Sequence, residues 1–158
     1  VSRDLAGELQ VPRDGAGVRF ALSFAVASFV LDEPAARAAE GPEFDSRPAP
    51  ADVDGTRRNL EGPAVLAADR YPRIAIRGLD AEGGPDDWRV RAVVEVRGRV
   101  HTLAVPARVE RDGDRLVARG EFPLRQTELG LTPFSVAMGA LQVRDELTIR
   151  YVLTARRR

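Results

Sequence analysis

The stretch that restricts the fold most runs from Trp88 to Leu124. It contains three runs rich in β-branched residues, 88–96, 100–105 and 116–122, joined by short turns that each contain a glycine. A side-chain period of two residues and turns this tight suit antiparallel strands, whereas helices satisfy neither. The sequence therefore predicts an antiparallel meander, and a functional site is expected on or inside a β-sheet.

Length and charge narrow the classes of partner. The chain has 158 residues, which predicts one domain that buries roughly two thirds of the surface of its unfolded chain. Its 24 basic residues are balanced by 24 acidic residues, so no bulk charge attracts a nucleic acid or an anionic membrane. The absence of cysteine excludes disulfides and thiolate chemistry. No apolar run reaches the roughly 20 residues of a transmembrane helix, so no transmembrane segment is expected.

Further strands are predicted on both sides of the meander. Alternating patterns cover Val1–Val11, Val18–Phe29, Arg73–Leu79 and Glu146–Ala155. In the second of these, the large side chains all point one way. The residues that share this face are Val18, Phe20, Leu22, Phe24 and Val26.

Two short helices are expected between the second and third of these patterns. The first covers Asp32–Glu40, with Asp32 as its cap and Pro34 in its first turn. The second covers Val53–Glu61 and is expected to be interrupted at Gly55. Six or seven strands against two short helices predict an all-β fold. A closed antiparallel barrel is favoured over a sandwich, because closure removes the exposed edges of a sheet.

Catalytic and metal sites find little support in the sequence. His101 is the only histidine, and no nucleophile or orienting carboxylate is placed beside it in the sequence. We therefore expect it to be an exposed or hydrogen-bonded strand residue. Six aspartates fall in predicted turns, where side chains of this type bond the local backbone: Asp52, Asp54, Asp86, Asp87, Asp112 and Asp114. No catalytic residue, metal ligand or cofactor is predicted.

Three separate segments together resemble the YceI-like family. The first comprises 55–60, 65–66 and 70–74, the second is the hairpin 96–106, and the third spans 127–145. Their order and spacing make the resemblance more specific than any single motif. It extends over most of the chain, from about Leu5 to Ala155.

The resemblance implies an antiparallel barrel similar to that of lipocalins, with an elongated interior that binds polyisoprenoid or other amphiphilic chains. Many members of the family are periplasmic or secreted, so the same location is expected here. Relatives carry a further strand with a Gly-His-Asn-His run, which would precede Val1. Residues 1–158 are therefore expected to form a single YceI-like domain without its first strand.

The expected ligand-binding residues are the large apolar side chains of the inward face. Burial of each CH₂ group contributes about 0.8 kcal/mol, so no polar anchor is needed for useful affinity. Small inward residues at Ala92, Ala118 and Gly120 favour a hollow interior, and the segments Pro48–Pro63 and Leu129–Gly139 are candidate gates. The predicted lining consists of Phe20, Leu22, Phe24, Val26, Ile74, Ile76, Val94, Leu103, Phe122, Phe134, Ile149 and Tyr151.

The function predicted from these features is non-catalytic carriage of a lipid-like amphiphile, with an isoprenoid as the favoured ligand. The expected partner is this small molecule and not a nucleic acid, and a homodimer is left open. Two alternatives remain: an enzyme acting on a hydrophobic substrate, and a filled barrel that serves as a protein-interaction module.

Overall fold

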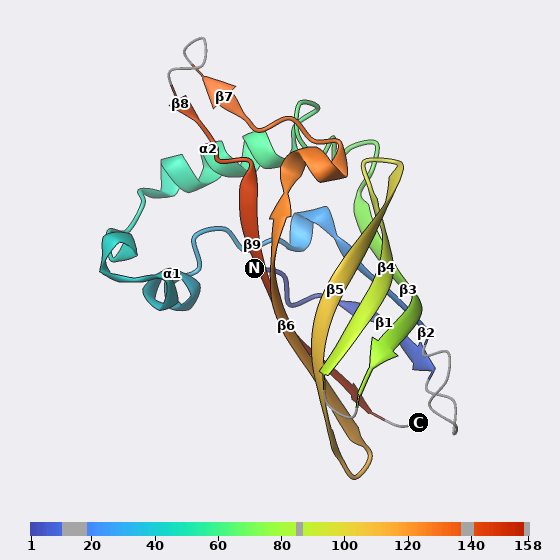
Figure 1. Ribbon diagram of the computed structural model, residues 1–158. Coiled ribbons are helices and arrows are strands. Elements are labelled where there is room, and N and C mark those ends of the chain that lie inside the picture. Colours follow the sequence, from blue (N-terminus) through green and yellow to red (C-terminus); the bar gives the residue numbers. More distant parts are fainter. Residues whose placement is uncertain (11–18, 85–86, 137–140, 157–158) are drawn as a thin grey trace.

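The computed structural model describes residues 1–10, 19–84, 87–136 and 141–156 (Figure 1). Seven antiparallel strands form one sheet in the order β1-β2-β3-β4-β5-β6-β9, and β7 pairs with β8 in a separate two-stranded sheet. The predicted all-β antiparallel fold is confirmed. The strands of the large sheet are β1 (Ala6–Gln10), β2 (Arg19–Ala25), β3 (Arg73–Gly83), β4 (Asp87–Val96), β5 (Arg99–Asp112), β6 (Arg115–Arg125) and β9 (Glu146–Arg156).

Short elements connect these strands. Two α-helices, α1 (Pro34–Glu40) and α2 (Pro50–Glu61), lie between β2 and β3. Single 3-10 turns are η1 (Val26–Ser28), η2 (Pro42–Phe44) and η3 (Gln126–Leu129), and the small sheet consists of β7 (Ser135–Val136) and β8 (Leu141–Gln142). The helices therefore form an insertion beside the sheet, as predicted.

The strand register assigns side chains to the two faces of the sheet. Residues directly opposite each other in antiparallel strands lie on the same face. Ile76 pairs with Val94, and Val94 pairs with His101. On the same face, nearer the β9 edge of the sheet, Phe122 pairs with Ile149. The apolar rows that the sequence assigned to one face thus run continuously across the sheet.

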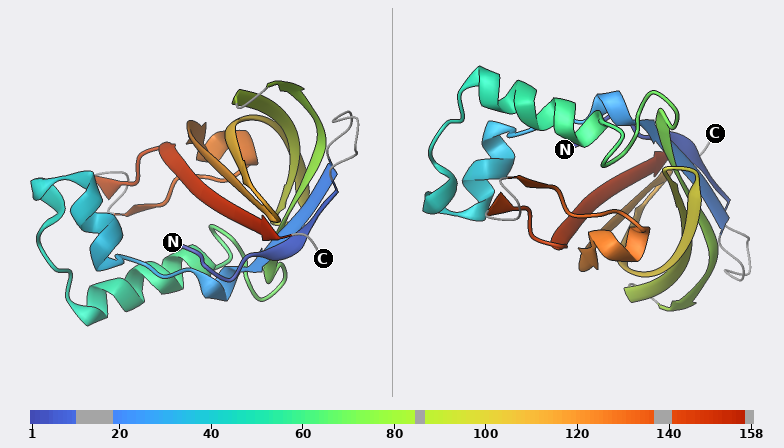
Figure 2. Two further views of the ribbon diagram at one scale, coloured as in Figure 1. Left: turned by 90° about the horizontal axis from the view of Figure 1, so that it is seen from below. Right: turned by 90° about the horizontal axis from the view of Figure 1, so that it is seen from above.

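The sheet curls into a half-barrel, which is clear when the molecule is viewed along the strands (Figure 2). Strands β1 and β9 are its two edges, and within the described residues each is paired with one neighbour. The predicted barrel is therefore present as an open curl, and the expected closure is not seen in the part of the chain that the structure describes. The face inside the curl is called the inward face below.

A packed core closes one end of the curl, at the top in Figure 1. Val96 contributes from the end of β4, Val26 from η1, and Leu131 from the segment after η3, and all are at most 8% exposed. Val65 and Leu66, which follow α2, complete this cluster. Four segments that are distant in the sequence therefore hold this end together.

Three local predictions differ from the structure. Helix α2 begins at Pro50 and passes through Gly55 without a break, because a proline suits the first helical turn and an exposed helix tolerates one glycine. Asp32 does not cap α1: its φ of 49° places it outside the helix, and its carboxylate accepts a hydrogen bond from Arg37 Nη1 at 2.7 Å. The strand predicted to reach Phe29 ends at Ala25, where η1 begins.

Candidate functional site

Most of the predicted ligand-binding residues lie on the inward face. All except Val26 are partly exposed, although they belong to the most apolar positions of the chain. Val26 is 1% exposed and belongs to the closed end, where Ile74 and Phe134 also pack against the core cluster. The inward face is thus an apolar surface that the protein's own atoms cover only in part.

Aromatic rings occupy the space beside the inward glycines. A Cβ added at Gly120 would lie 2.6 Å from both Cε1 and the hydroxyl oxygen of Tyr151, so this ring covers the glycine. Ala92 is only 1% exposed, whereas Ala118 is partly exposed. The expectation that Gly120 opens the interior is therefore wrong, because the Tyr151 ring fills the space that the glycine leaves, and Ala92 is covered as well.

Tyr151 also joins two strands through its hydroxyl group. This hydroxyl donates a hydrogen bond to the Pro106 carbonyl oxygen at 2.5 Å, and burial raises the pKa of Tyr151 to about 12. The neutral phenol is therefore the form that the inward face holds. Tyr151 offers a ligand an apolar ring, since its polar atom is already engaged.

The structure describes the two candidate gates only in part. Most of Pro48–Pro63 is helix α2, which begins three residues before the predicted helix Val53–Glu61. In Leu129–Gly139, residues 137–140 lie outside the described residues, and β7 with β8 accounts for the adjoining chain. Their role as gates stays a prediction.

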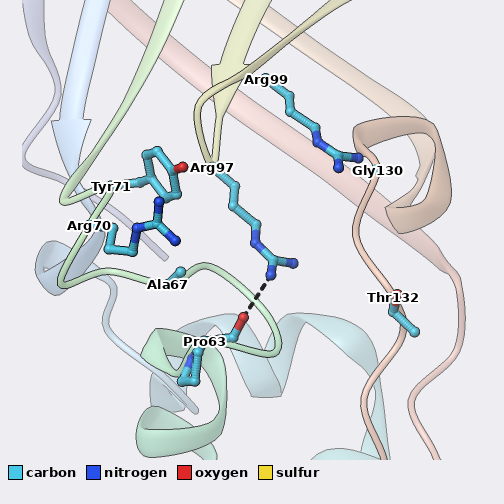
Figure 3. A pocket seen from close by; sticks show the side chains of 8 residues that line it. All are labelled: Pro63, Ala67, Arg70, Tyr71, Arg97, Arg99, Gly130 and Thr132. Carbon is cyan, nitrogen blue, oxygen red and sulfur yellow. Dashed lines mark hydrogen bonds between the residues drawn. The ribbon is translucent and has the colours of Figure 1, made fainter.

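A second feature, which the sequence did not predict as a site, is a cavity of about 540 Å³ at the closed end of the curl (Figure 3). The β4–β5 turn, the segment between α2 and β3, and the segment after η3 form its walls. Three of the lining residues are arginines. The lining consists of Pro63, Ala67, Arg70, Tyr71, Arg97, Arg99, Gly130 and Thr132, and we call this space the arginine cavity.

The β4–β5 turn fixes Arg97 in the cavity wall. Arg97 and Gly98 have φ values of 52° and 68°, which is the left-handed geometry of a two-residue hairpin turn. The Arg97 Nη2 group donates a hydrogen bond to the Pro63 carbonyl oxygen at 2.7 Å (Figure 3). Beside this turn, the Arg70 guanidinium lies 5.5 Å from the ring centroid of Tyr71. Two of the three guanidinium groups are therefore positioned by neutral partners.

Arg99 and His101 bring the inward face to the cavity. Arg99 pairs with Val96 and His101 with Val94, so both point to the inward side of β5. A Cβ at Gly130 would lie 3.1 Å from Arg99 Nη1 and 3.5 Å from His101 Cε1. Contrary to the expectation of an exposed or hydrogen-bonded histidine, His101 is partly buried, and its Nε2 has no hydrogen-bond partner among the described residues.

Side-chain hydrogen bonds hold the segment that carries Gly130. Thr127, in η3, donates from its hydroxyl to Asp145 Oδ2 at 2.7 Å and from its backbone N–H to Oδ1 at 2.9 Å. The hydroxyl of Thr127, together with its backbone N–H, lowers the pKa of Asp145. The buried Gln126 side chain donates to the Arg144 carbonyl oxygen at 2.7 Å. These bonds tie η3 to the start of β9 and so position one wall of the arginine cavity.

The arginine cavity differs in charge from several other arginine positions on the surface. At those positions arginines meet carboxylates, as in the pairs Arg37–Asp32, at 2.7 Å, and Arg119–Glu110, at 2.6 Å. Among the described residues, no carboxylate lines the cavity. The Arg97-Gly98-Arg99 run was visible in the sequence, but only the fold brings Arg70 to it.

The described residues contain no group of three or more His, Cys, Asp or Glu side chains arranged to hold a metal ion. Within the same residues, no helix has both the length and the apolar character needed to cross a membrane.

Solved structures with the same fold are known, although no family model and no curated protein matches this sequence. BcnA of Burkholderia cenocepacia superposes with a TM-score of 0.72 at 17% identity, over 96% of this chain and 83% of that chain. The YceI protein of Campylobacter jejuni superposes with a TM-score of 0.70 at 9% identity, over 100% of this chain and 84% of that one. The chain therefore has a YceI-like fold, which confirms the sequence resemblance at the level of structure.

Proposed function

We propose that this protein is a non-catalytic carrier that binds a lipid-like amphiphile, with an isoprenoid chain as the favoured ligand, against its inward face. The observation that supports the proposal most is the partial exposure of this apolar face. Residues such as Phe24, Ile76 and Phe122 lie inside the curl but are not sealed by other parts of the chain. When a ligand covers apolar surface that is in contact with water, the free energy of the system falls, which favours binding.

The expected strength of such binding follows from the area covered. Each CH₂ group removed from water contributes about 0.8 kcal/mol, so a ten-carbon segment offers roughly 8 kcal/mol before the cost of ordering the ligand. Micromolar affinity corresponds to about 8 kcal/mol. A longer chain than this is therefore needed for tight binding, which favours an extended isoprenoid over a short lipid.

The non-catalytic part of the proposal is supported by the surroundings of His101. A histidine that acts as a general base is normally oriented by a carboxylate or a carbonyl group. Among the described residues, no carboxylate or carbonyl oxygen accepts a hydrogen bond from the His101 ring, and its neighbour across the strand is Val94. We also propose a periplasmic or secreted location, which rests on the sequence resemblance alone.

The carrier proposal is tested with a fluorescent polyene alcohol as ligand. Phe24→Asp and Ile76→Asp each place a carboxylate on the inward face, where covering it with the ligand costs several kcal/mol. We expect at least about tenfold weaker binding for both variants. Ala21→Asp is the matched control, because Ala21 is exposed on the opposite face of β2. Equal binding by all three folded variants would refute the proposed ligand face.

Native mass spectrometry of protein purified without detergent separates the carrier from the interaction module. The rings that cover Gly78 and Gly120 show that part of the interior is filled, which is the observation that favours the module. A retained apolar molecule supports the carrier. Repeated recovery of the bare chain, together with no polyene binding, supports the module.

A further inference from the structure

The arginine cavity combines positive charge with an absence of internal compensation. Arg70, Arg97 and Arg99 line one space of about 540 Å³, and within the described residues no carboxylate lines it with them. Figure 3 shows the three guanidinium groups approaching this space from two different segments. Like charges held close together destabilise the fold unless an opposite charge compensates them.

The backbone of this region is also held in a costly conformation. Ala67 and Arg97 both have positive φ values, 50° and 52°, in a region that residues other than glycine rarely occupy. The Ala67 N–H donates to the Gly62 carbonyl oxygen at 2.8 Å, and Arg97 is held by Pro63. The fold therefore fixes the cavity wall before any ligand arrives. The positive φ of Arg97 belongs to the β4–β5 turn, whereas that of Ala67 is strain of a kind often found at binding sites.

The available donors indicate the chemistry of a ligand. A guanidinium group presents several N–H donors in a plane, which matches the oxygens of a phosphate or a carboxylate. Arg97 uses donors on Pro63 and Ala64, whereas for Arg99 the structure shows no bond to a carboxylate or a carbonyl oxygen within the described residues. Arg70 likewise shows only its contact with the Tyr71 ring, so Arg99 and Arg70 are the two lining arginines with most donors left for an anion.

We propose that the arginine cavity is an anion-binding site that takes a phosphate or carboxylate group. This proposal rests on the carrier function proposed above. The ligand of the carrier is then an amphiphile whose acidic head group is held by Arg99 and Arg70. A free inorganic anion has the same chemistry, and the experiment below distinguishes the two sources.

The strand register places Arg99 on the same side of β5 as the inward apolar row. Arg99, His101 and Leu103 follow one another on the inward side of β5. Four residues along a strand span roughly 13 Å, so the head-group site lies about that far from the nearest predicted apolar contact on this strand. The cavity is therefore located at one end of the apolar row, as required for a ligand with a charged head and an apolar chain.

The test compares two probes that share one polyene chain, an alcohol and its phosphate monoester. The wild-type protein is expected to bind the monoester more tightly than the alcohol. Loss of one charged hydrogen-bonding group costs about 1.5–3 kcal/mol, so Arg99→Gln is expected to reduce this preference by about ten- to hundredfold. The preference should also fall as salt rises, because Arg70 and Arg99 are exposed to solvent.

Arg77→Gln is the matched control, because it removes the same charge from an exposed position on the outer side of β3. It should keep the wild-type preference for the monoester. Arg70→Gln is a second test variant, which perturbs a different wall of the cavity. Circular dichroism and urea unfolding confirm that each variant is folded. A preference that survives in both Arg99→Gln and Arg70→Gln overturns the proposal.

A third probe, inorganic phosphate, separates the two sources of the anion. If phosphate displaces the monoester but not the alcohol, the head group and the free anion share the arginine cavity, which supports the proposal. If neither polyene binds, the carrier function fails, and titration calorimetry with phosphate alone then decides on the site. Phosphate binding that Arg99→Gln abolishes identifies a free-anion site, whereas no phosphate binding to the wild-type protein overturns the anion site.

Discussion

Gly78→Ala is the substitution whose effect the structure predicts most directly. Gly78 is buried in β3, and Phe20 is its partner in β2. A Cβ at this position would lie 2.5 Å from Phe20 Cδ1 and 2.9 Å from Cζ, and it would also collide with Cε1. Three atoms of one ring would therefore have to move to accommodate a single methyl group.

The magnitude follows from two opposing effects. Overpacking of this kind costs about 1–3 kcal/mol, whereas alanine in a strand gains roughly 0.5–1 kcal/mol over glycine. We expect a net loss of about 1–2 kcal/mol in the free energy of unfolding, which corresponds to a decrease in melting temperature of roughly 2–8 °C for a chain of this size. Urea unfolding followed by the fluorescence of Trp88, the only tryptophan, measures this loss.

The control is the same chemical change at Gly55, in the middle of α2. A Cβ there would meet only Arg58 Nη2, at 3.8 Å, so Gly55→Ala should stabilise the protein by up to about 1 kcal/mol. Phe20→Leu provides a second control, because a smaller side chain leaves room for the new methyl group. If Gly78→Ala is harmless, or costs as much with Leu at position 20, the assignment of the ring to this space is wrong.

Two further predictions concern pH. The pKa of Tyr151 is raised from 10.0 to about 12, so in a Tyr71→Phe background the tyrosinate absorbance of the folded protein should rise near pH 12. The free energy of unfolding should fall between pH 10 and 12, because only the unfolded chain ionises this tyrosine there. An absorbance midpoint near pH 10 would contradict the burial of Tyr151. The pKa of Asp145 in the folded protein lies below its ordinary value of 3.8. The ionised carboxylate should therefore stabilise the fold above pH 3.8, and this stabilisation should disappear as the pH falls through the folded-state pKa. Asp145→Asn should remove this part of the pH dependence of the urea midpoint.

The two binding proposals involve different residues of the same strand, β5. Leu103 belongs to the predicted apolar contacts, whereas Arg99 and His101 belong to the closed, positively charged end of the strand. A ligand without a charged group would use only the first part of this row. Measurement of both probes on the same variants therefore shows whether the protein selects ligands by chain alone or by chain and head group.

Much of the candidate ligand face was predictable from the sequence, because the rows Phe20–Phe24 and Ile74–Ile76 need only a local period of two residues to be recognised. The rest of the site was not. That Tyr151 covers Gly120 depends on the register between β6 and β9, and no local pattern encodes which ring fills which gap. The space beside Gly120 was overestimated for this reason.

The sequence by itself determined the strands and which of their side chains share a face, because alternation and turn residues such as Arg97-Gly98 act over a few neighbouring positions. Only the tertiary structure decided how far the sheet curls, which end the core closes, and that Arg70 lies beside Arg97 and Arg99. These outcomes depend on the packing of segments distant in the chain, and the free energy of such packing belongs to the assembled fold rather than to any one stretch of residues.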